Sequence, residues 1–248
     1  MGLALDAAHS LGLESLKLYS CPPVPEAAPA LARLLSSTTL TTLSFRLGRF
    51  DWPAWGFDAA AAALLAPALR TNRTLRFLEL VNIRLWDDSD AAVVMLGALT
   101  GHVSLRSLNL SENDFETEAA REAAGAAFGA LVAANAPALE RLDLSDCNLR
   151  DAGVGPLAAA LPLNAHLREL SLHNACLSGV ASRQLLAALR ANTSLRRFNA
   201  SDVDLQDYTE PFPEFDESER LLSEGTEFVD DRERARATAE VAAAAASA

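Results

Sequence analysis

The chain has 248 residues, and half of them are hydrophobic, which is enough to bury the core of one ordinary domain and excludes disorder of the whole chain. Its formal net charge of −12 argues against a nucleic-acid-binding protein, because neutralising phosphates requires clustered Lys and Arg. The same charge suits a protein partner with a basic surface. The acidity is concentrated in residues 206–248, which hold twelve Asp or Glu against four Arg.

The first residues, MGLALDAAHSLG, predict a partial N-terminal helix or cap over residues 1–12. They lack the basic start and long apolar core of a secretory signal peptide. No segment reaches the ~18 apolar residues of a membrane span, apart from an Ala-rich end that is short and only weakly hydrophobic, so no membrane partner is expected. Because the first repeat has little cover, we expect a monomer, or a weak dimer through an uncapped end, or a fragment of a longer protein.

From residue 13 to residue 205 the pattern L-x-x-L-x-L-x-x-(N/C)-x-L recurs seven times. The copies are 27, 35, 30, 34, 28 and 28 residues apart and begin at Leu13, Leu40, Leu75, Leu105, Leu139, Leu167 and Leu195. A single copy cannot bury its apolar side chains, so neighbouring copies must stack. The pattern predicts an α/β leucine-rich-repeat solenoid, a curved horseshoe with a parallel inner sheet and outer helices.

The fifth copy, LERLDLSDCNL, shows the expected unit most clearly. Its leucines point inward and alternate with outward Arg141, Asp143 and Ser145, which is the period of a strand. The following residues 150–161 place apolar side chains at helical spacing. An Asn precedes several of the next strands, and we expect a left-handed turn there that closes the helix, at Asn72, Asn135, Asn164 and Asn192. At the ninth motif position, Cys21, Asn113 and Cys147 are suited to satisfying backbone groups, whereas Gly48, Ile83, Ala175 and Val203 interrupt that polar series.

The 28-residue unit, with LDLSDCNLRDAGVGPLAAAL as its best copy, resembles the ribonuclease-inhibitor-like subfamily of leucine-rich repeats. The segments LRTNRTLRFLEL and LRANTSLRRFNA are similar to the repeat regions of nucleotide-binding immune receptors. The resemblance implies a horseshoe fold and binding of another protein, and members of the family bind many unrelated proteins.

Stacked copies would align their outward strand residues in columns on the concave face. The middle column is expected to contain Lys17, Ser44, Glu79, Asn109, Asp143, Ser171 and Asn199. We expect a polar, acid-leaning groove toward the C-terminal repeats, able to accept Lys or Arg from a partner, although a merely solvated face is equally consistent with the pattern. The candidate partner-binding residues are Lys17, Tyr19, Arg46, Glu79, Asn109, Glu112, Arg141, Asp143, Asp146, His173 and Asn199.

A second candidate surface is aromatic. The second repeat carries DWPAWGF, with Trp52 and Trp55, and the third carries Trp86 at a similar place after its strand. Clustered Trp can anchor a protein interface, because the rings bury a large area at small entropic cost. The alternative is that these rings fill the enlarged loops as local core.

After Leu205 the repeats stop and an acidic segment, residues 206–248, ends in an Ala-rich stretch predicted to be helical. Its first half holds aromatic and aliphatic residues that could cap the last repeat. The alternative is a disordered acidic tail that recruits a basic protein.

Cysteines and histidines give no sign of a metal or catalytic centre. Cys21, Cys147 and Cys176 are too far apart for a zinc site and odd in number for a disulfide framework, so we expect free thiols in a cytoplasmic protein. The four histidines lack metal-ligand spacing, and no phosphate loop or nucleophile motif occurs, so no cofactor and no catalytic residue are expected.

The function expected from the sequence is a non-catalytic protein-interaction scaffold. Two alternatives are a fragment of a nucleotide-binding leucine-rich-repeat sensor and a Ran-type GTPase-activating protein, whose family resembles this chain in having similar repeats before an acidic C-terminal region. A cytoskeletal cap of the tropomodulin sort has similar repeats, but this sequence has no matching N-terminal actin-binding segment.

Overall fold

The computed structural model describes residues 2–21, 25–48 and 57–200. Strands and helices alternate along the chain, and each strand begins two residues after the first leucine of a motif copy. The strands are β1 (Ser15–Tyr19), β2 (Thr42–Arg46), β3 (Phe77–Val81), β4 (Ser107–Asn109), β5 (Arg141–Asp143), β6 (Glu169–Ser171) and β7 (Arg197–Asn199). The helices are α1 (Gly2–Ser10), η1 (Pro25–Ala27), α2 (Ala28–Leu35), α3 (Ala59–Thr71), α4 (Ser89–Leu99), α5 (Glu118–Ala133), α6 (Arg150–Ala160), η2 (Leu161–Leu163) and α7 (Gly179–Ala191).

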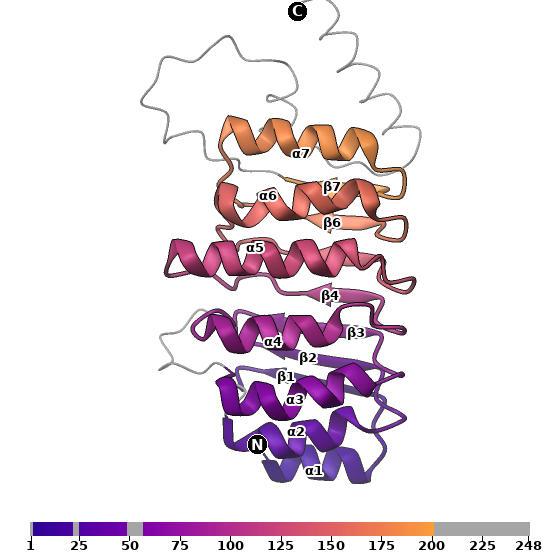
Figure 1. Ribbon diagram of the computed structural model, residues 1–248. Coiled ribbons are helices and arrows are strands. Elements are labelled where there is room, and N and C mark those ends of the chain that lie inside the picture. Colours follow the sequence, from indigo (N-terminus) through magenta and orange to yellow (C-terminus); the bar gives the residue numbers. More distant parts are fainter. Residues whose placement is uncertain (1, 22–24, 49–56, 201–248) are drawn as a thin grey trace, which may run out of the picture.

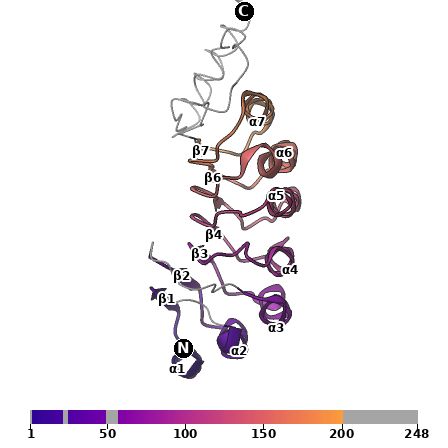
Figure 2. The same cartoon turned by 90° about the vertical axis from the view of Figure 1, so that its left-hand side faces the viewer.

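The seven strands form one parallel sheet whose spatial order, β1 to β7, is also their order in the sequence. Each strand therefore pairs with the strands of the preceding and following repeats (Figure 1). Figure 2 shows the strands along one side of the row and the helices along the other, with the row bowed so that the helices lie on its outer side. The α/β solenoid predicted from the repeated leucines is confirmed.

The core lies between the sheet and the helices. The motif leucines of successive copies stack on one another, and those at the fourth motif position, such as Leu78, Leu108, Leu142 and Leu170, are 2% exposed or less. Helix side chains at the expected spacing, including Leu65, Leu96 and Leu157, cover them from the outside. No helix among the described residues is long and apolar enough to span a membrane.

Close packing between α5 and α6 depends on glycine. A Cβ atom added at Gly125 would lie 2.6 Å from the carbonyl oxygen of Ala152 and 2.8 Å from that of Gly153. Real Cβ atoms do not approach backbone this closely, so the helices could not keep their separation with a larger residue there.

The asparagines that precede the strands do not form the predicted left-handed turns, with one exception. Asn72, Asn164 and Asn192 have negative φ and extended ψ, and only Asn135 among the four has a positive φ, of 51°. The buried amide of Asn164 donates to the Val132 carbonyl of the preceding repeat at 2.8 Å and accepts from the Leu167 backbone N–H at 2.7 Å. Asn72 and Asn192 form equivalent bonds, so this position joins neighbouring repeats instead of reversing the chain.

His102 occupies the same position in the fourth repeat. Its Nδ1 accepts from the backbone N–H of Leu105 at 3.2 Å, as the asparagine oxygen does elsewhere. Its buried Nε2 has no hydrogen-bond partner of good geometry among the described residues. Burial lowers the pKa of His102, and the nearby Leu69 carbonyl opposes that effect. This histidine is therefore a structural substitute for asparagine, and its lowered pKa favours the neutral imidazole.

The predicted domain boundaries at residues 12 and 205 stay predictions. Helix α1 lies within residues 1–12 and packs against α2, where Asp6 accepts from Arg33 at 2.7 Å. The proposed cap or acidic tail, residues 206–248, lies outside the described residues.

Candidate functional site

Strand pairing places the outward side chains of the sheet in columns. Pairing brings Lys17, Ser44, Glu79, Asn109, Asp143, Ser171 and Asn199 into one row of partners, which is the middle column expected from the sequence. The column is not uniformly open, because Ser44 is fully buried and its hydroxyl donates to Glu79 Oε2 at 2.6 Å. The Ser44 hydroxyl on the neighbouring strand therefore fixes the carboxylate of Glu79.

A neighbouring column at the third motif position carries more charge than we expected. Its members are Ser15, Thr42, Phe77, Ser107, Arg141, Glu169 and Arg197. Glu169 lies between two arginines, with its carboxylate 3.1 Å from Arg141 Nε and 3.4 Å from Arg197 Nη1. Sequence reasoning named only Arg141 from this triad; aligning the third motif position of every copy would have found the other two.

These columns line a hollow of about 260 Å³ over β3–β7. Its charged residues are three carboxylates and two guanidinium groups, namely Glu79, Asp143, Glu169, Arg141 and Arg197. The hollow thus holds one more carboxylate than guanidinium group, and the acid-leaning groove expected from the sequence stays a prediction. The arginines are its most accessible charges, with side chains 51% and 46% exposed, whereas the Glu169 side chain is 30% exposed.

Asp143 is engaged by its own turn. Its Oδ1 accepts from the backbone N–H of Ser145 at 3.0 Å and from the Ser145 hydroxyl at 2.6 Å. Asn109 forms the equivalent bond with the Ser111 N–H at 2.9 Å. Both residues shape the end of a strand, and both line the hollow.

The turns after the strands hold two more predicted site residues. Glu112 and Asp146 have φ of 61° and 56°, in the left-handed region, and each is partly exposed. Their neighbours at the ninth motif position confirm the expected backbone role. Asn113 forms hydrogen bonds to backbone groups of two repeats, and the Cys147 thiol donates to the Leu110 carbonyl at 3.3 Å. Desolvation by burial raises the pKa of that thiol to about 12.

The N-terminal strands present a different set of side chains. Tyr19 pairs with Arg46 across β1 and β2, and both are exposed, as is Lys17 in the adjacent column. His173 follows the middle column at the end of β6 and is partly exposed, and Asn199 lies at the C-terminal end of the hollow. The concave face thus has a cationic and aromatic zone on β1–β2 and a zone of alternating charge on β5–β7.

The predicted aromatic surface is not present at Trp86. This residue is 4% exposed and packs against Phe115 and Phe128, with ring centroids 5.1 and 5.6 Å away. It is a core residue, as the alternative interpretation had it, because two aromatic rings of the next repeat cover it. Trp52 and Trp55 lie outside the described residues. No cluster of potential metal ligands occurs within the described part of the chain.

Comparison with known proteins agrees with the geometry. The leucine rich repeat family matches residues 101–122 and 136–158. The ribonuclease inhibitor of Mus musculus is 28% identical over 182 residues, which are 73% of this chain and 37% of that protein. The chain thus spans little more than a third of that relative's length.

Two solved structures match this chain at low similarity. The tropomodulin C-terminal domain from Caenorhabditis elegans matches with a TM-score of 0.41 at 12% identity, over 77% of this chain and 92% of that one. The actin-binding site 2 of leiomodin-1 matches with a TM-score of 0.34 at 15% identity, over 79% and 76% of the two chains. The seven aligned motif copies and the parallel sheet make this chain a leucine-rich-repeat solenoid, and its repeats are similar to those of the ribonuclease inhibitor.

Proposed function

We propose that this chain is a non-catalytic scaffold that binds a protein partner on the concave face of its sheet. The observation that carries the proposal is the alignment of seven strands, which sets exposed charged and polar side chains in columns along a single surface. Rigid, regularly spaced side chains lose little entropy when they bind. The name of the relative, ribonuclease inhibitor, describes a protein that acts on another protein, which supports the same role here.

The side chains of the hollow indicate the chemistry of the partner. Arg141 and Arg197 are accessible, and their guanidinium groups can donate to a carboxylate of the partner as well as to Glu169. Asp143 lines the same hollow and Asp146 follows in the turn after β5, and both carboxylates can bind Lys or Arg. We therefore propose a partner surface of mixed charge, with its basic residues over the two aspartates and an acidic residue over the arginines.

The thiols support a cytoplasmic place of action. Cys21, Cys147 and Cys176 are free cysteines, and Cys21 is exposed. Free thiols persist in reducing compartments, where disulfides are rare.

Affinity capture with charge-reversed variants tests the proposal. Arg141→Glu and Arg197→Glu should each weaken capture of the partner about thirtyfold or more, since truncating a buried interfacial charge pair costs about 2–5 kcal/mol and each 1.4 kcal/mol is about tenfold. Glu79 and Asp143 are less suitable targets because both hold local structure. Arg150→Glu, on an exposed residue at the start of α6, is the matched control and should capture the partner normally. If all variants capture the partner equally well, the partner does not bind at the arginines of the concave face, and the proposal is wrong.

The two alternatives named from the sequence stay predictions. Stimulation of GTP hydrolysis by Ran would indicate the GTPase activator. A nucleotide-binding domain encoded on the same transcript would indicate the sensor fragment.

A further inference from the structure

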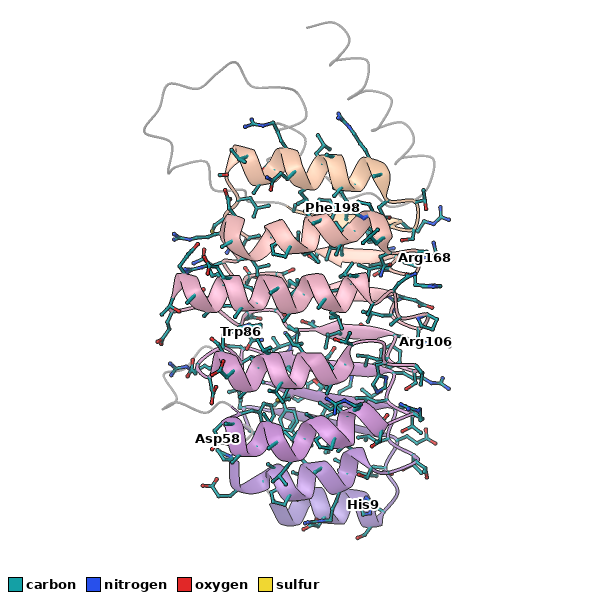
Figure 3. The ribbon with its side chains drawn as sticks, in the orientation of Figure 1. His9, Asp58, Trp86, Arg106, Arg168 and Phe198 are labelled. Carbon is teal, nitrogen blue, oxygen red and sulfur yellow. The ribbon has the colours of Figure 1, made fainter. Side chains whose placement is uncertain are left out.

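The two long edges of the solenoid carry opposite charge. The loops from strand to helix and the first helical turns hold eleven described carboxylates and few arginines; the acids are Glu26, Asp58, Asp87, Asp88, Asp90, Glu112, Asp114, Glu116, Glu118, Asp146 and Asp151. The loops from helix to strand between α3 and β7, with the last helical turns, carry the opposite charge. Their arginines, here called the arginine edge, are Arg70, Arg73, Arg76, Arg106, Arg168, Arg190 and Arg196. Figure 3 shows Arg106 and Arg168 on one side of the stack and Asp58 on the other.

Helix dipoles explain only part of this separation. Asp58 and Asp88 cap helix N-termini, and Arg70 and Arg190 lie in last helical turns, where such charges are stabilising. Four arginines of the edge have no such role, because they stand at the second motif position, directly before a strand. These are Arg76, Arg106, Arg168 and Arg196.

Backbone hydrogen bonds join the residues at the second motif position of successive repeats into one row along the solenoid. Arg106 N–H donates to the Arg76 carbonyl at 2.8 Å, and Arg196 N–H donates to that of Arg168 at 2.8 Å. Glu140 stands between the two pairs in the same row and Glu14 begins the row, so the edge has few acids of its own. Neighbouring rows of a sheet are about 4.8 Å apart, which spreads the four arginines over about 20 Å.

A hollow of about 360 Å³ opens at this edge beside α3 and β3. It is lined by three arginines, four hydroxyl residues and one alanine, namely Arg73, Arg76, Arg106, Thr38, Thr41, Thr74, Ser104 and Ala138. Three of the hydroxyls are fixed by donating to backbone carbonyls. Within the described part of the chain, the guanidinium groups of Arg76 and Arg106 form no ion pair or hydrogen bond with each other or with any neighbour. The site is thus built from cations without matching anions.

The chain itself contains a matching anionic segment. Residues 206–248 carry a net charge of −8, whereas everything before them sums to −4. The segment follows β7, whose preceding residue Arg196 belongs to the arginine edge. An acidic ligand from outside would have to approach a chain of net charge −12 and compete with a segment tethered at a millimolar effective concentration.

The length of the segment is sufficient. Three rows separate Arg196 from Arg106 in the stack, about 14 Å, and β7 itself is three residues long, about 10 Å. An extended chain covers about 25 Å with eight residues. We propose that part of residues 206–248 binds the arginine edge of the same molecule, with Asp and Glu side chains paired to Arg76 and Arg106.

Carbodiimide crosslinking of the full chain tests this contact. The reagent joins an amine to a carboxylate that touches it, and the sequence contains a single lysine, Lys17, on the concave face. The variants Arg76→Lys and Arg106→Lys keep the charge and add one amine at the arginine edge. Peptide mass spectrometry of the monomer band should then show that amine joined to residues 206–248. In 1 M salt the yield should fall severalfold, because the screening length shortens from about 8 to about 3 Å.

Arg150→Lys, on the opposite edge, is the matched control and should join only to nearby carboxylates. Circular dichroism should show the same melting temperature for all variants. Three results would overturn the proposal: no link from either edge variant to residues 206–248, equal linkage from the control, or linkage found only between two molecules. Crosslinks from the edge amines to Glu140 alone would also count against it, since they show an active reagent and no bound segment.

Discussion

Replacing Asn113 with alanine should cost this protein a large share of its stability. The side chain is fully buried and its Oδ1 accepts from the backbone N–H groups of Ile83 and Leu85, at 3.0 and 3.1 Å. Its Nδ2 donates to the Leu80 carbonyl at 2.6 Å and to that of Leu110 at 2.8 Å. One amide therefore satisfies backbone groups in the turn of the preceding repeat as well as its own.

The expected loss follows from the two N–H groups left without an acceptor. A buried polar group that loses its partner costs about 1–3 kcal/mol, so two cost about 2–6 kcal/mol. Native proteins have a free energy of unfolding of about 5–15 kcal/mol in total. With a urea m-value of about 2–3 kcal/mol/M, the unfolding midpoint should fall by about 0.7–3 M.

Urea unfolding followed by circular dichroism measures this loss, and Asn109→Ala is the matched control. Asn109 lies in the same repeat but is partly exposed, and its Oδ1 accepts one bond, from Ser111 N–H. The control should lose about 1 kcal/mol or less. If the two alanine variants unfold at the same urea concentration, the buried hydrogen bonds of Asn113 add no more stability than the single bond of Asn109, and the prediction is refuted.

Three further predictions concern single positions. His102→Asn should raise the melting temperature and make it fall less steeply in acid. The pKa of His102 in the folded protein is below its ordinary value of 6.5, so the stability that the neutral side chain contributes is complete above pH 6.5 and is lost as the pH falls below that value. An unchanged dependence of the melting temperature on pH would contradict this. Gly125→Ala should destabilise by about 1–3 kcal/mol in urea through its clash with α6, whereas Gly97→Ala, with open space around it, should be neutral or stabilising; equal effects would refute the close packing. Cys147 should resist alkylation by iodoacetamide in the folded protein while exposed Cys21 reacts, and rapid labelling of Cys147 would show that the turn opens.

The fold could be predicted from the sequence because each repeat has the same register. The leucines recur at fixed motif positions, and strand pairing can only align like positions, so the middle column from Lys17 to Asn199 followed directly. Repeat length did not matter, since the extra residues lie outside the strands. What failed was the interpretation of individual side chains.

The errors have physical causes that the pattern does not carry. Asn before a strand suits a left-handed turn, but a buried amide that links two repeats competes with that conformation and wins at Asn164. Burial of Trp86 depends on Phe115 and Phe128, which are distant in sequence from it. The arginine edge was missed because the second motif position was read only as a spacer, although four arginines share it.

Strand order that follows chain order has an evolutionary consequence. Every repeat contacts only its two neighbours across the sheet, so duplicating or deleting a unit between equivalent leucines leaves the remaining pairings unchanged. Each added unit would lengthen the concave surface by one step and bring a few new outward side chains. A lineage carrying such a gene can therefore vary the reach and specificity of its protein by recombination, without having to invent a new core.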